Sequence, residues 1–392
     1  MNTDQLETFY PVIIAGGGPV GLYLGCLLHE KKIPFVILEK RQERSNHSRS
    51  LGIHPVSLEL FDALGIANRF VERGIKIQRG LAFSDSGQIG SISFENCPKP
   101  FNYILSLPQH ITESILEEHL NSLNPDALIR GAEVTNIEER EECVTISVSH
   151  SGQEFSLECR CLVGCDGKES IVRKEAGIPF EGSSYPDTYI MGDFSDNTIF
   201  ESDAAVFLPD EGLIESFPLI DSRRRWVVKT EKYIDQVNRR DLEDRVAARI
   251  GHDLSEEENF MLSSFGVQKL IARPIARKRI ALAGDSAHIV SPIGGQGMNL
   301  GWLDASTLAE SLKDSLGKED DLHLFRSLEE YARHRQQITE KVIRRAEWNM
   351  KLGRKPSFPS LRNAIVWLML KTPLQKRVAR LFTMRNLEGR FL

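Results

Sequence analysis

Residues 11–41 of the 392-residue chain read PVIIAGGGPVGLYLGCLLHEKKIPFVILEKR. An apolar run is followed by a glycine cluster, a helix-like segment that ends at Lys31 and Lys32, and a second apolar run that ends at Glu39. This order predicts a βαβ unit. The stretch from Val12 to Leu28 is uncharged, but its five glycines and one proline favour strand, turn and helix over a membrane-spanning helix.

The glycines of this unit have the spacing of a dinucleotide-binding turn. Gly16, Gly18 and Gly21 form G-x-G-x-x-G between the first strand and the helix. The first permits the tight turn, the second lets the backbone approach a pyrophosphate, and the third lets helix and strand pack closely. The helix N-terminus offers N–H groups to the phosphates. Glu39, 18 residues after Gly21, can accept hydrogen bonds from ribose hydroxyls. A glycine-rich turn followed by a surface glutamate is the alternative, but we predict a bound dinucleotide.

The composition is that of a folded enzyme. Hydrophobic residues make up 41% and charged residues 27%, with 29 Gly and 17 Pro, which excludes collagen-like, disordered and coiled-coil classes. The length exceeds the roughly 250 to 300 residues at which single cores stop growing, so we expect two domains. The net charge of -6 gives the protein no overall positive potential that would attract nucleic acid, so we expect no nucleic acid partner.

The cysteines and the N-terminus point to a reducing compartment. Six cysteines are too few and too unevenly spread for a disulfide framework, and the first residues lack a signal peptide pattern, so we expect a cytoplasmic protein. Cys159, Cys161 and Cys165 have no histidine nearby in the sequence. We therefore interpret them as small buried side chains and predict no metal site.

Further strand patterns surround this unit. Short apolar runs from about 75 to 94 and from about 189 to 272 alternate with turns such as Ile220-Asp221-Ser222, which predicts an antiparallel sheet with one charged helix near residues 240–250. From Leu308 onward the pattern is helical.

Two later segments suggest which dinucleotide binds. CDGKESIVR (165–173) and RIALAGDSAHIVSPIGGQGMNLGWLDA (279–305) each follow a predicted strand. With the N-terminal glycines they closely resemble, in order and spacing, the three motifs of single-component FAD-dependent monooxygenases of the para-hydroxybenzoate hydroxylase type, the aromatic-ring hydroxylases. The resemblance covers about residues 11–345. Ser286 departs mildly from it, because the family commonly has alanine there.

The resemblance implies roles for individual residues. Asp285 would hydrogen-bond the ribityl chain of FAD, and residues 292–299 would run under the isoalloxazine with backbone N–H groups near its pyrimidine oxygen. Asp166 and Gly167 would touch FAD and contribute to a transient nicotinamide nucleotide site. Without the resemblance, Asp285 could be a helix N-cap, and the other two segments could be ordinary turns.

Other matches are looser. Arg49 would contact an FAD phosphate, and Gln109 would lie near the flavin chain. Arg173 is a weaker match to the motif that contains Asp166 and Gly167. We interpret His288 as structural and predict no catalytic residue, because the register of the sheet is unknown. The predicted cofactor-binding residues are Gly16, Gly18, Pro19, Val20, Gly21, Glu39, Lys40, Arg49, Gln109, Asp166, Asp285, Pro292, Gly295, Gly297, Met298 and Asn299.

The resemblance also implies an α/β fold class and a domain plan. It consists of a discontinuous Rossmann-like FAD-binding domain (1–75, 100–180 and 273–345), an inserted β-sheet substrate domain (76–99 and 181–272) and a helical C-terminal extension (346–392). The implied reaction is reduction of FAD by NADPH or NADH, reaction with O2 to a flavin C4a-hydroperoxide, and hydroxylation of an organic, aromatic small molecule. No second G-x-G-x-x-G is present for a separate NADPH domain. Substrate identity, the choice between NADPH and NADH, and the oligomeric state stay open.

Three alternatives share the glycine motif. A flavin-dependent halogenase is disfavoured, because its Trp-x-Trp-x-Ile-Pro segment is absent. A flavin-dependent reductase of a prenyl or polyketide substrate would differ in needing no oxygen. A non-catalytic dinucleotide-binding protein would require neither the segment 292–299 nor a substrate sheet.

The C-terminus has an unusual charge. Residues 351–392 contain ten Lys and Arg and a single acid, Glu388, a net charge of +9, so residues 1–350 have -15. Mixed with apolar residues, these cations could lie on an anionic membrane. We favour the alternative in which the segment packs on the FAD domain with its cations toward the acidic body.

Overall fold

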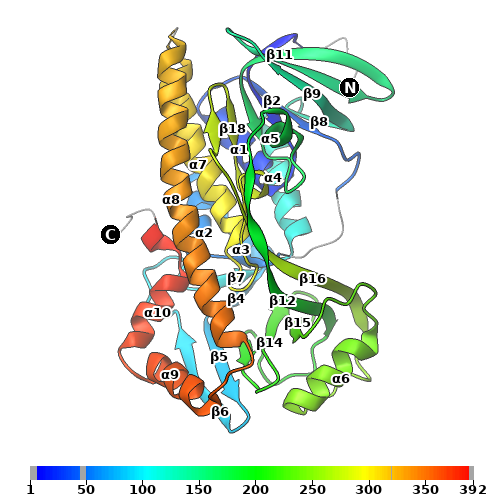
Figure 1. Ribbon diagram of the computed structural model, residues 1–392, viewed down its shortest axis with the longest axis vertical. Coiled ribbons are helices and arrows are strands. Elements are labelled where there is room, and N and C mark those ends of the chain that lie inside the picture. Colours follow the sequence, from blue (N-terminus) through cyan, green and yellow to red (C-terminus); the bar gives the residue numbers. More distant parts are fainter. Residues whose placement is uncertain (1–6, 45–49, 319, 388–392) are drawn as a thin grey trace.

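The predicted βαβ unit forms the centre of the first sheet of the computed structural model, which describes residues 7–44, 50–318 and 320–387 (Figure 1). β1 (Phe9–Ala15) and β2 (Phe35–Glu39) pair in parallel, and α1 (Pro19–Glu30) connects them. The sheet has the order β17-β18-β11-β1-β2-β8. β9 and β10 extend β11 as an antiparallel ribbon. The remaining bounds in this sheet are β8 (Leu128–Arg130), β9 (Ala132–Glu139), β10 (Val144–His150), β11 (Gln153–Gly164), β17 (Ala276–Arg277) and β18 (Ile280–Leu282).

Helices cover the centre of this sheet, where the strands are apolar on both faces. All five residues of β2 are buried, as expected for a parallel strand covered on both faces. α1 packs between α4 and α7. The helices of this part are α2 (Pro55–Ala63), α3 (Ala67–Arg73), α4 (Gln109–Leu123), α5 (Ile171–Glu175) and α7 (Gly297–Leu316), with the short helix η2 (Gly284–Ser286). A small sheet of β3 (Gly52–Ile53), β7 (Ile104–Ser106) and β4 (Ile75–Ile77) lies beside them.

A second sheet has the order β19-β16-β12-β15-β14-β13-β5-β6. Its strand pairs are antiparallel except for β13 with β5. The long strands β12 and β16 run from the first sheet region down into it (Figure 1). The bounds are β5 (Arg79–Ser84), β6 (Gly87–Ser93), β12 (Phe180–Ser195), β13 (Ala204–Phe207), β14 (Ile214–Leu219), β15 (Arg223–Thr230), β16 (Asn259–Ala272) and β19 (His288–Ile289). The predicted charged helix is α6 (Arg239–Ile250).

Helix α8 (Asp321–Gly353) runs alongside both sheets (Figure 1). It continues without a break through residue 346, where the sequence suggested the start of an extension. The α/β fold class is confirmed, with a first sheet whose central strands are parallel, a second largely antiparallel sheet and a helical C-terminal region. The domain boundaries themselves stay a prediction.

The C-terminal segment packs differently from the expectation. α9 (Pro359–Lys371) and α10 (Leu374–Phe382) lie mainly against β6 of the second sheet, and not mainly against the FAD domain. Gly90 explains the close fit, because a Cβ there would lie 2.8 Å from Leu370 Cβ. The end of α10 and the last turn, η3 (Arg385–Leu387), reach the first domain. There His54 Nδ1 contacts the Phe382 carbonyl oxygen, and Arg385 Nε donates to Glu59 at 2.5 Å. Among the described helices, none combines the length and apolarity that crossing a membrane requires.

Candidate active site

A cavity of about 1830 Å³ joins the first sheet to the second. Its wall includes the turn before α1, the segment 283–298, one face of the second sheet and one side of α8. Single-ligand pockets usually have about 300 to 1,000 Å³. The cavity therefore has room for a dinucleotide and a substrate together.

The glycine turn forms one end of this cavity. Gly16 has a φ of +106°, and a Cβ on it would lie 2.4 Å from the carbonyl oxygen of Cys165. A Cβ on Gly21 would lie 2.0 Å from the Gly16 oxygen, so this residue is needed for packing and does not line the cavity. Gly18 faces open space, and no side chain caps the first turn of α1. Pro19 and Val20 complete this end of the wall.

Glu39 is placed as the predicted ribose acceptor. Its carboxylate accepts hydrogen bonds from Gly17 N at 2.7 Å and from Arg41 Nε at 2.8 Å, and it lines the cavity beside Lys40. Burial alone would raise the pKa of Glu39, but the hydrogen bonds and charge of Arg41 outweigh it and hold the pKa below its usual value. Glu39 is therefore an ionised acceptor. Its Oε1 also accepts from Arg41 N at 3.0 Å, so Oε2, which accepts from Gly17 N, is the oxygen that keeps a second lone pair for a ligand.

Asp166 lies on the wall next to the glycine turn. Its Oδ2 accepts from Val172 N at 3.2 Å, whereas Oδ1 is buried without a hydrogen-bond partner among the described residues. Burial raises the pKa of this carboxyl. Gly167 lines the cavity with it. A buried acceptor without a partner is costly, which favours a ligand donor at this point.

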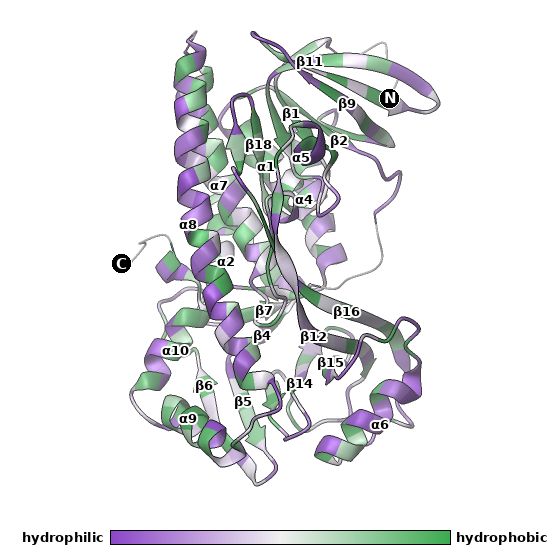
Figure 2. Ribbon diagram, in the orientation of Figure 1, coloured by the Kyte–Doolittle hydropathy of each residue, from purple (hydrophilic) through white to green (hydrophobic). Residues whose placement is uncertain are grey.

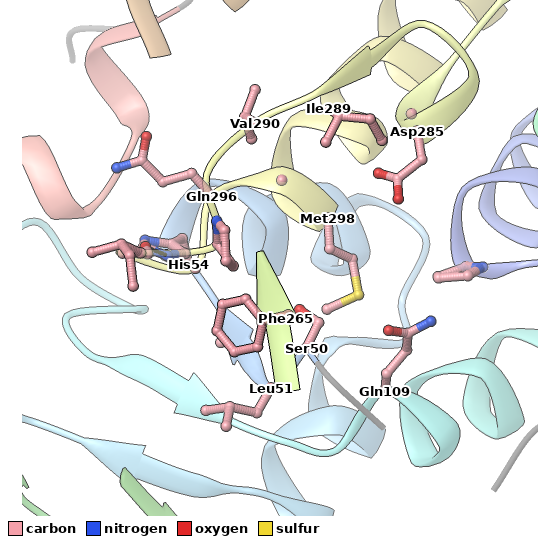
Figure 3. Close-up of a pocket in the computed structure, with 18 of the residues that line it drawn as sticks. Ser50, Leu51, His54, Gln109, Phe265, Asp285, Ile289, Val290, Gln296 and Met298 are labelled. Atoms are coloured by element: carbon pink, nitrogen blue, oxygen red, sulfur yellow. Dashed lines mark hydrogen bonds between the residues drawn. The ribbon is translucent and has the colours of Figure 1, made fainter. Parts of the chain in front are cut away.

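Figure 3 shows Asp285 and Met298 on one side of the cavity and Gln109 on the other, all pointing toward the same space. Asp285 is open to the cavity, yet the surrounding walls desolvate it and raise the pKa of its carboxyl. Gln109 Nε2 donates to Glu113 Oε1 at 2.9 Å, which orients its amide. Pro292, Gly295 and Gly297 also line the wall.

Asn299 does not line the cavity. It is fully buried, accepts from His54 N at 2.8 Å, and donates to the carbonyl oxygens of Gly52 and Gly295. It therefore ties the start of α7 to the segment around β3. The one remaining predicted residue, Arg49, lies outside the described residues.

A buried network missed by the sequence analysis supports the segment with Asp285. Asp304 accepts from Gly284 N at 3.0 Å, contacts His288 Nε2 at 2.6 Å and pairs with Arg335 at 2.7 Å. Burial would raise the pKa of Asp304, but the charges of His288 and Arg335 outweigh it and hold the pKa low. His288 therefore has the structural position that we expected, and α7 and α8 jointly fix the turn at Gly284.

Arg173 also acts on the backbone of this region. Its guanidinium donates to the carbonyl oxygens of Ser286 at 3.0 Å and Lys168 at 2.7 Å. It does not line the cavity. Arg173 thus links the Asp166 segment to the Asp285 segment.

The far end of the cavity is formed by the second sheet. Successive side chains of a strand point to opposite faces of the sheet. One face of strands β12 to β16 therefore points into the cavity, and that face is largely apolar. The sequence could not select these side chains without the register. They include Met191, Val206, Glu215, Phe217, Val227 and Phe265.

The residues present fit FAD. One continuous wall carries the open glycine turn, the ionised acceptor Glu39, and two carboxyl groups that have acceptor oxygens without a partner among the described residues, those of Asp166 and Asp285. These groups match a pyrophosphate and the hydroxyls of a ribose and a ribityl chain. The described residues include no cluster of His, Cys, Asp and Glu that could hold a metal ion, and all six cysteines are free.

Comparisons with known proteins agree with this geometry. Residues 9–346 match the family model described as an FAD binding domain. An uncharacterised aromatic compound monooxygenase of Bacillus subtilis (strain 168) is 33% identical over 351 residues, covering 88% of this chain and 68% of the relative. The anhydrotetracycline monooxygenase of Streptomyces rimosus is 30% identical over 383 residues, covering 92% and 73%. The rifampicin monooxygenase of Streptomyces venezuelae is 32% identical over 310 residues, covering 77% and 64%.

The chain thus spans about two thirds of the length of these relatives. Among solved structures, the p-nitrophenol 4-monooxygenase of Pseudomonas putida shares the fold over 99% of this chain and 100% of its own, with a TM-score of 0.89 and 23% identity. The anhydrotetracycline hydroxylase of Streptomyces rimosus has a TM-score of 0.80 and 29% identity, covering 96% of this chain and 76% of that one. The chain belongs to the FAD-binding-domain family and, within it, to the FAD-dependent aromatic-ring hydroxylases of the para-hydroxybenzoate hydroxylase type.

Proposed function

We propose that this chain uses NAD(P)H and O2 to hydroxylate an aromatic small molecule held between the second sheet and bound FAD. The observation that supports this most is the continuous cavity, because it joins a dinucleotide-binding turn to an apolar sheet face. Bound FAD would supply the redox chemistry, accepting a hydride from NAD(P)H and activating O2 once reduced.

The residues of the chain would bind, orient and exclude water. Glu39, Asp166 and Asp285 would accept hydrogen bonds from the cofactor, and the open backbone of the turn at Gly18 would receive its pyrophosphate. The segment Pro292–Met298 would lie along the flavin ring, as the family resemblance implies. The apolar sheet face would keep water away from the reacting atoms.

The substrate class follows from the size of the cavity and from the relatives. Their names specify rifampicin, anhydrotetracycline and p-nitrophenol, which are aromatic compounds of very different size. The apolar lining and large volume favour a ring system over a small polar metabolite. The Asp166-Gly167 segment supports a transient nicotinamide nucleotide site as proposed for the family.

A panel of aromatic compounds tests this proposal. A true substrate should accelerate NAD(P)H oxidation by the FAD-loaded protein and yield a hydroxylated product. Without substrate, oxidation should be slow and release hydrogen peroxide. Turnover that continues equally well without O2 would favour a flavin-dependent reductase instead.

We propose, as a second and separate function, that α9 contacts an anionic membrane surface. Trp367 is 52% exposed and Leu368 49%, on a helix along which apolar residues predominate (Figure 2), and Lys371 is exposed at its end. Trp367→Ser with Leu368→Ser should reduce sedimentation with phosphatidylserine vesicles at low salt. Ile199→Ser removes an apolar side chain elsewhere that is still more exposed, at 92%, and should have no effect. Absence of wild-type sedimentation would contradict this second function.

A further inference from the structure

The sheet end of the cavity contains one carboxyl group that the proposed cofactor contacts do not use. Glu215 lies on β14, where it pairs in register with Val206 of β13 and Val227 of β15. All three side chains line the cavity, as do Phe217, two residues further along β14, and Leu213, which directly precedes this strand. The carboxyl group therefore stands among apolar side chains, with Arg225, which pairs in register with Phe217, as the cation that lines the cavity nearby.

Glu215 is buried without a counter-charge in the described part of the chain. Its side chain is 8% exposed, and among the described residues it makes no hydrogen bond or ion pair. The cations on the neighbouring strand are already matched, because Arg225 pairs with Asp193 at 2.7 Å and Lys229 with Asp187 at 3.2 Å. Burial alone raises the pKa of Glu215 to about 7. An isolated buried carboxyl is costly to the fold, which indicates that its partner arrives from outside.

Two other buried acids, Asp187 and Asp304, have ion-pair partners that explain their burial. Asp187 is held by Arg354 and Lys229, and Asp304 by Arg335. Each of these acids joins secondary structure elements. Glu215 joins nothing and is directed into a cavity, so packing does not account for it.

We propose that Glu215 is the specificity-determining residue of the substrate end, where it binds a hydroxyl hydrogen-bond donor on an uncharged aromatic ring and excludes ring carboxylates. This inference rests on the proposed function, since it assumes that the sheet end holds the substrate. An ionised Glu215 accepts a hydrogen bond from a ring hydroxyl, and it repels a second carboxylate across a poorly solvated space. The apolar surroundings at Val206, Val227 and Phe217 receive the ring itself.

Three matched probes test the inference without turnover. 2-Naphthol, 2-methoxynaphthalene and 2-naphthoate share one apolar body and differ in donor and charge. Binding to oxidised, FAD-loaded protein is measured by equilibrium dialysis at pH 8.5, without NAD(P)H. At this pH Glu215 is ionised, and a phenolic hydroxyl with a pKa near about 10 keeps its proton.

Wild-type protein should bind 2-naphthol about tenfold more tightly than its methyl ether, the effect expected of one hydrogen bond to a charged group, and should bind 2-naphthoate most weakly. Glu215→Leu should abolish the preference for the hydroxyl. Glu215→Gln, which keeps the shape of the side chain, should bind 2-naphthoate more tightly than wild type. Glu211→Gln changes an exposed glutamate outside the cavity and should behave as wild type.

Three results would each overturn the inference. The first is wild-type binding without a preference for 2-naphthol. The second is a preference that survives in Glu215→Leu, and the third is a 2-naphthoate affinity that is unchanged in Glu215→Gln. FAD content is measured on the same samples. Full FAD binding together with any of these results contradicts the role of Glu215 alone, whereas wild-type protein that binds no FAD contradicts the proposed function.

Discussion

Glu215→Gln should stabilise the FAD-loaded protein at alkaline pH and change little at acidic pH. Burial raises the pKa of this carboxyl from 4.5 to about 7, so the folded protein holds a proton there that the unfolded chain has already lost. The stability contributed by the protonated group is complete below about pH 4.5 and is lost as the pH rises through about 7. Glutamine keeps the shape of the protonated acid but cannot ionise.

The size of the effect follows from the same pKa values. Each unit of pKa shift corresponds to about 1.4 kcal/mol. The shift from 4.5 to about 7 therefore means that ionising Glu215 in the folded protein costs about 3 kcal/mol at pH 8.5. At pH 5 the difference between wild type and Glu215→Gln should be below about 1 kcal/mol. The groups that bind FAD titrate equally in both proteins and cancel in the comparison.

Urea unfolding at pH 5, 7 and 8.5 measures this difference. Trp226, which is 1% exposed and pairs in register with Ser216 of β14, provides a fluorescence signal from the strand next to Glu215. Glu211→Gln controls for the loss of an exposed glutamate. A difference between wild type and Glu215→Gln that does not change with pH would refute the reasoning, because it would mean that water in the cavity solvates the carboxylate.

Three further substitutions test the cofactor end. Gly21→Ala should abolish FAD binding, measured by flavin fluorescence after denaturation, because its Cβ would lie 2.0 Å from the Gly16 oxygen; retained flavin would contradict the packing argument. Glu39→Arg should weaken FAD by replacing an acceptor with a cation, and unchanged affinity in titration would exclude Glu39 from the site. Asp304→Asn should lower the free energy of unfolding by about 3 to 5 kcal/mol, since it leaves Arg335 buried without its counter-charge. Urea unfolding detects that loss, and a change below about 1 kcal/mol would argue against the network.

Local sequence patterns predicted the parts of the structure that depend on neighbouring residues. The glycine spacing placed the turn before α1, because only glycine accepts the close approaches at Gly16 and Gly21. The turn at Asp221 and Ser222 was also visible, and both residues have a positive φ that suits a tight hairpin. Glu39 follows from its fixed distance along a βαβ unit.

Contacts between distant segments could not be predicted in this way. The Asp304 network joins α7 to α8, and no sequence spacing relates Asp304 to Arg335. Glu215 was missed because a shift of one residue in strand register would turn its side chain to the opposite face. The C-terminal helices were expected on the FAD domain, but their apolar side chains, such as Val366 and Leu370, pack into the core of the second sheet.

Turnover under ¹⁸O2 tests the monooxygenase assignment most directly. The FAD-loaded protein is supplied with NAD(P)H and a compound that accelerates its oxidation, and the product is analysed by mass spectrometry. We expect one ¹⁸O atom in each hydroxylated product, with one NAD(P)H consumed per product in the coupled reaction. Product that forms without O2, or that contains oxygen from water instead of ¹⁸O2, would contradict the assignment.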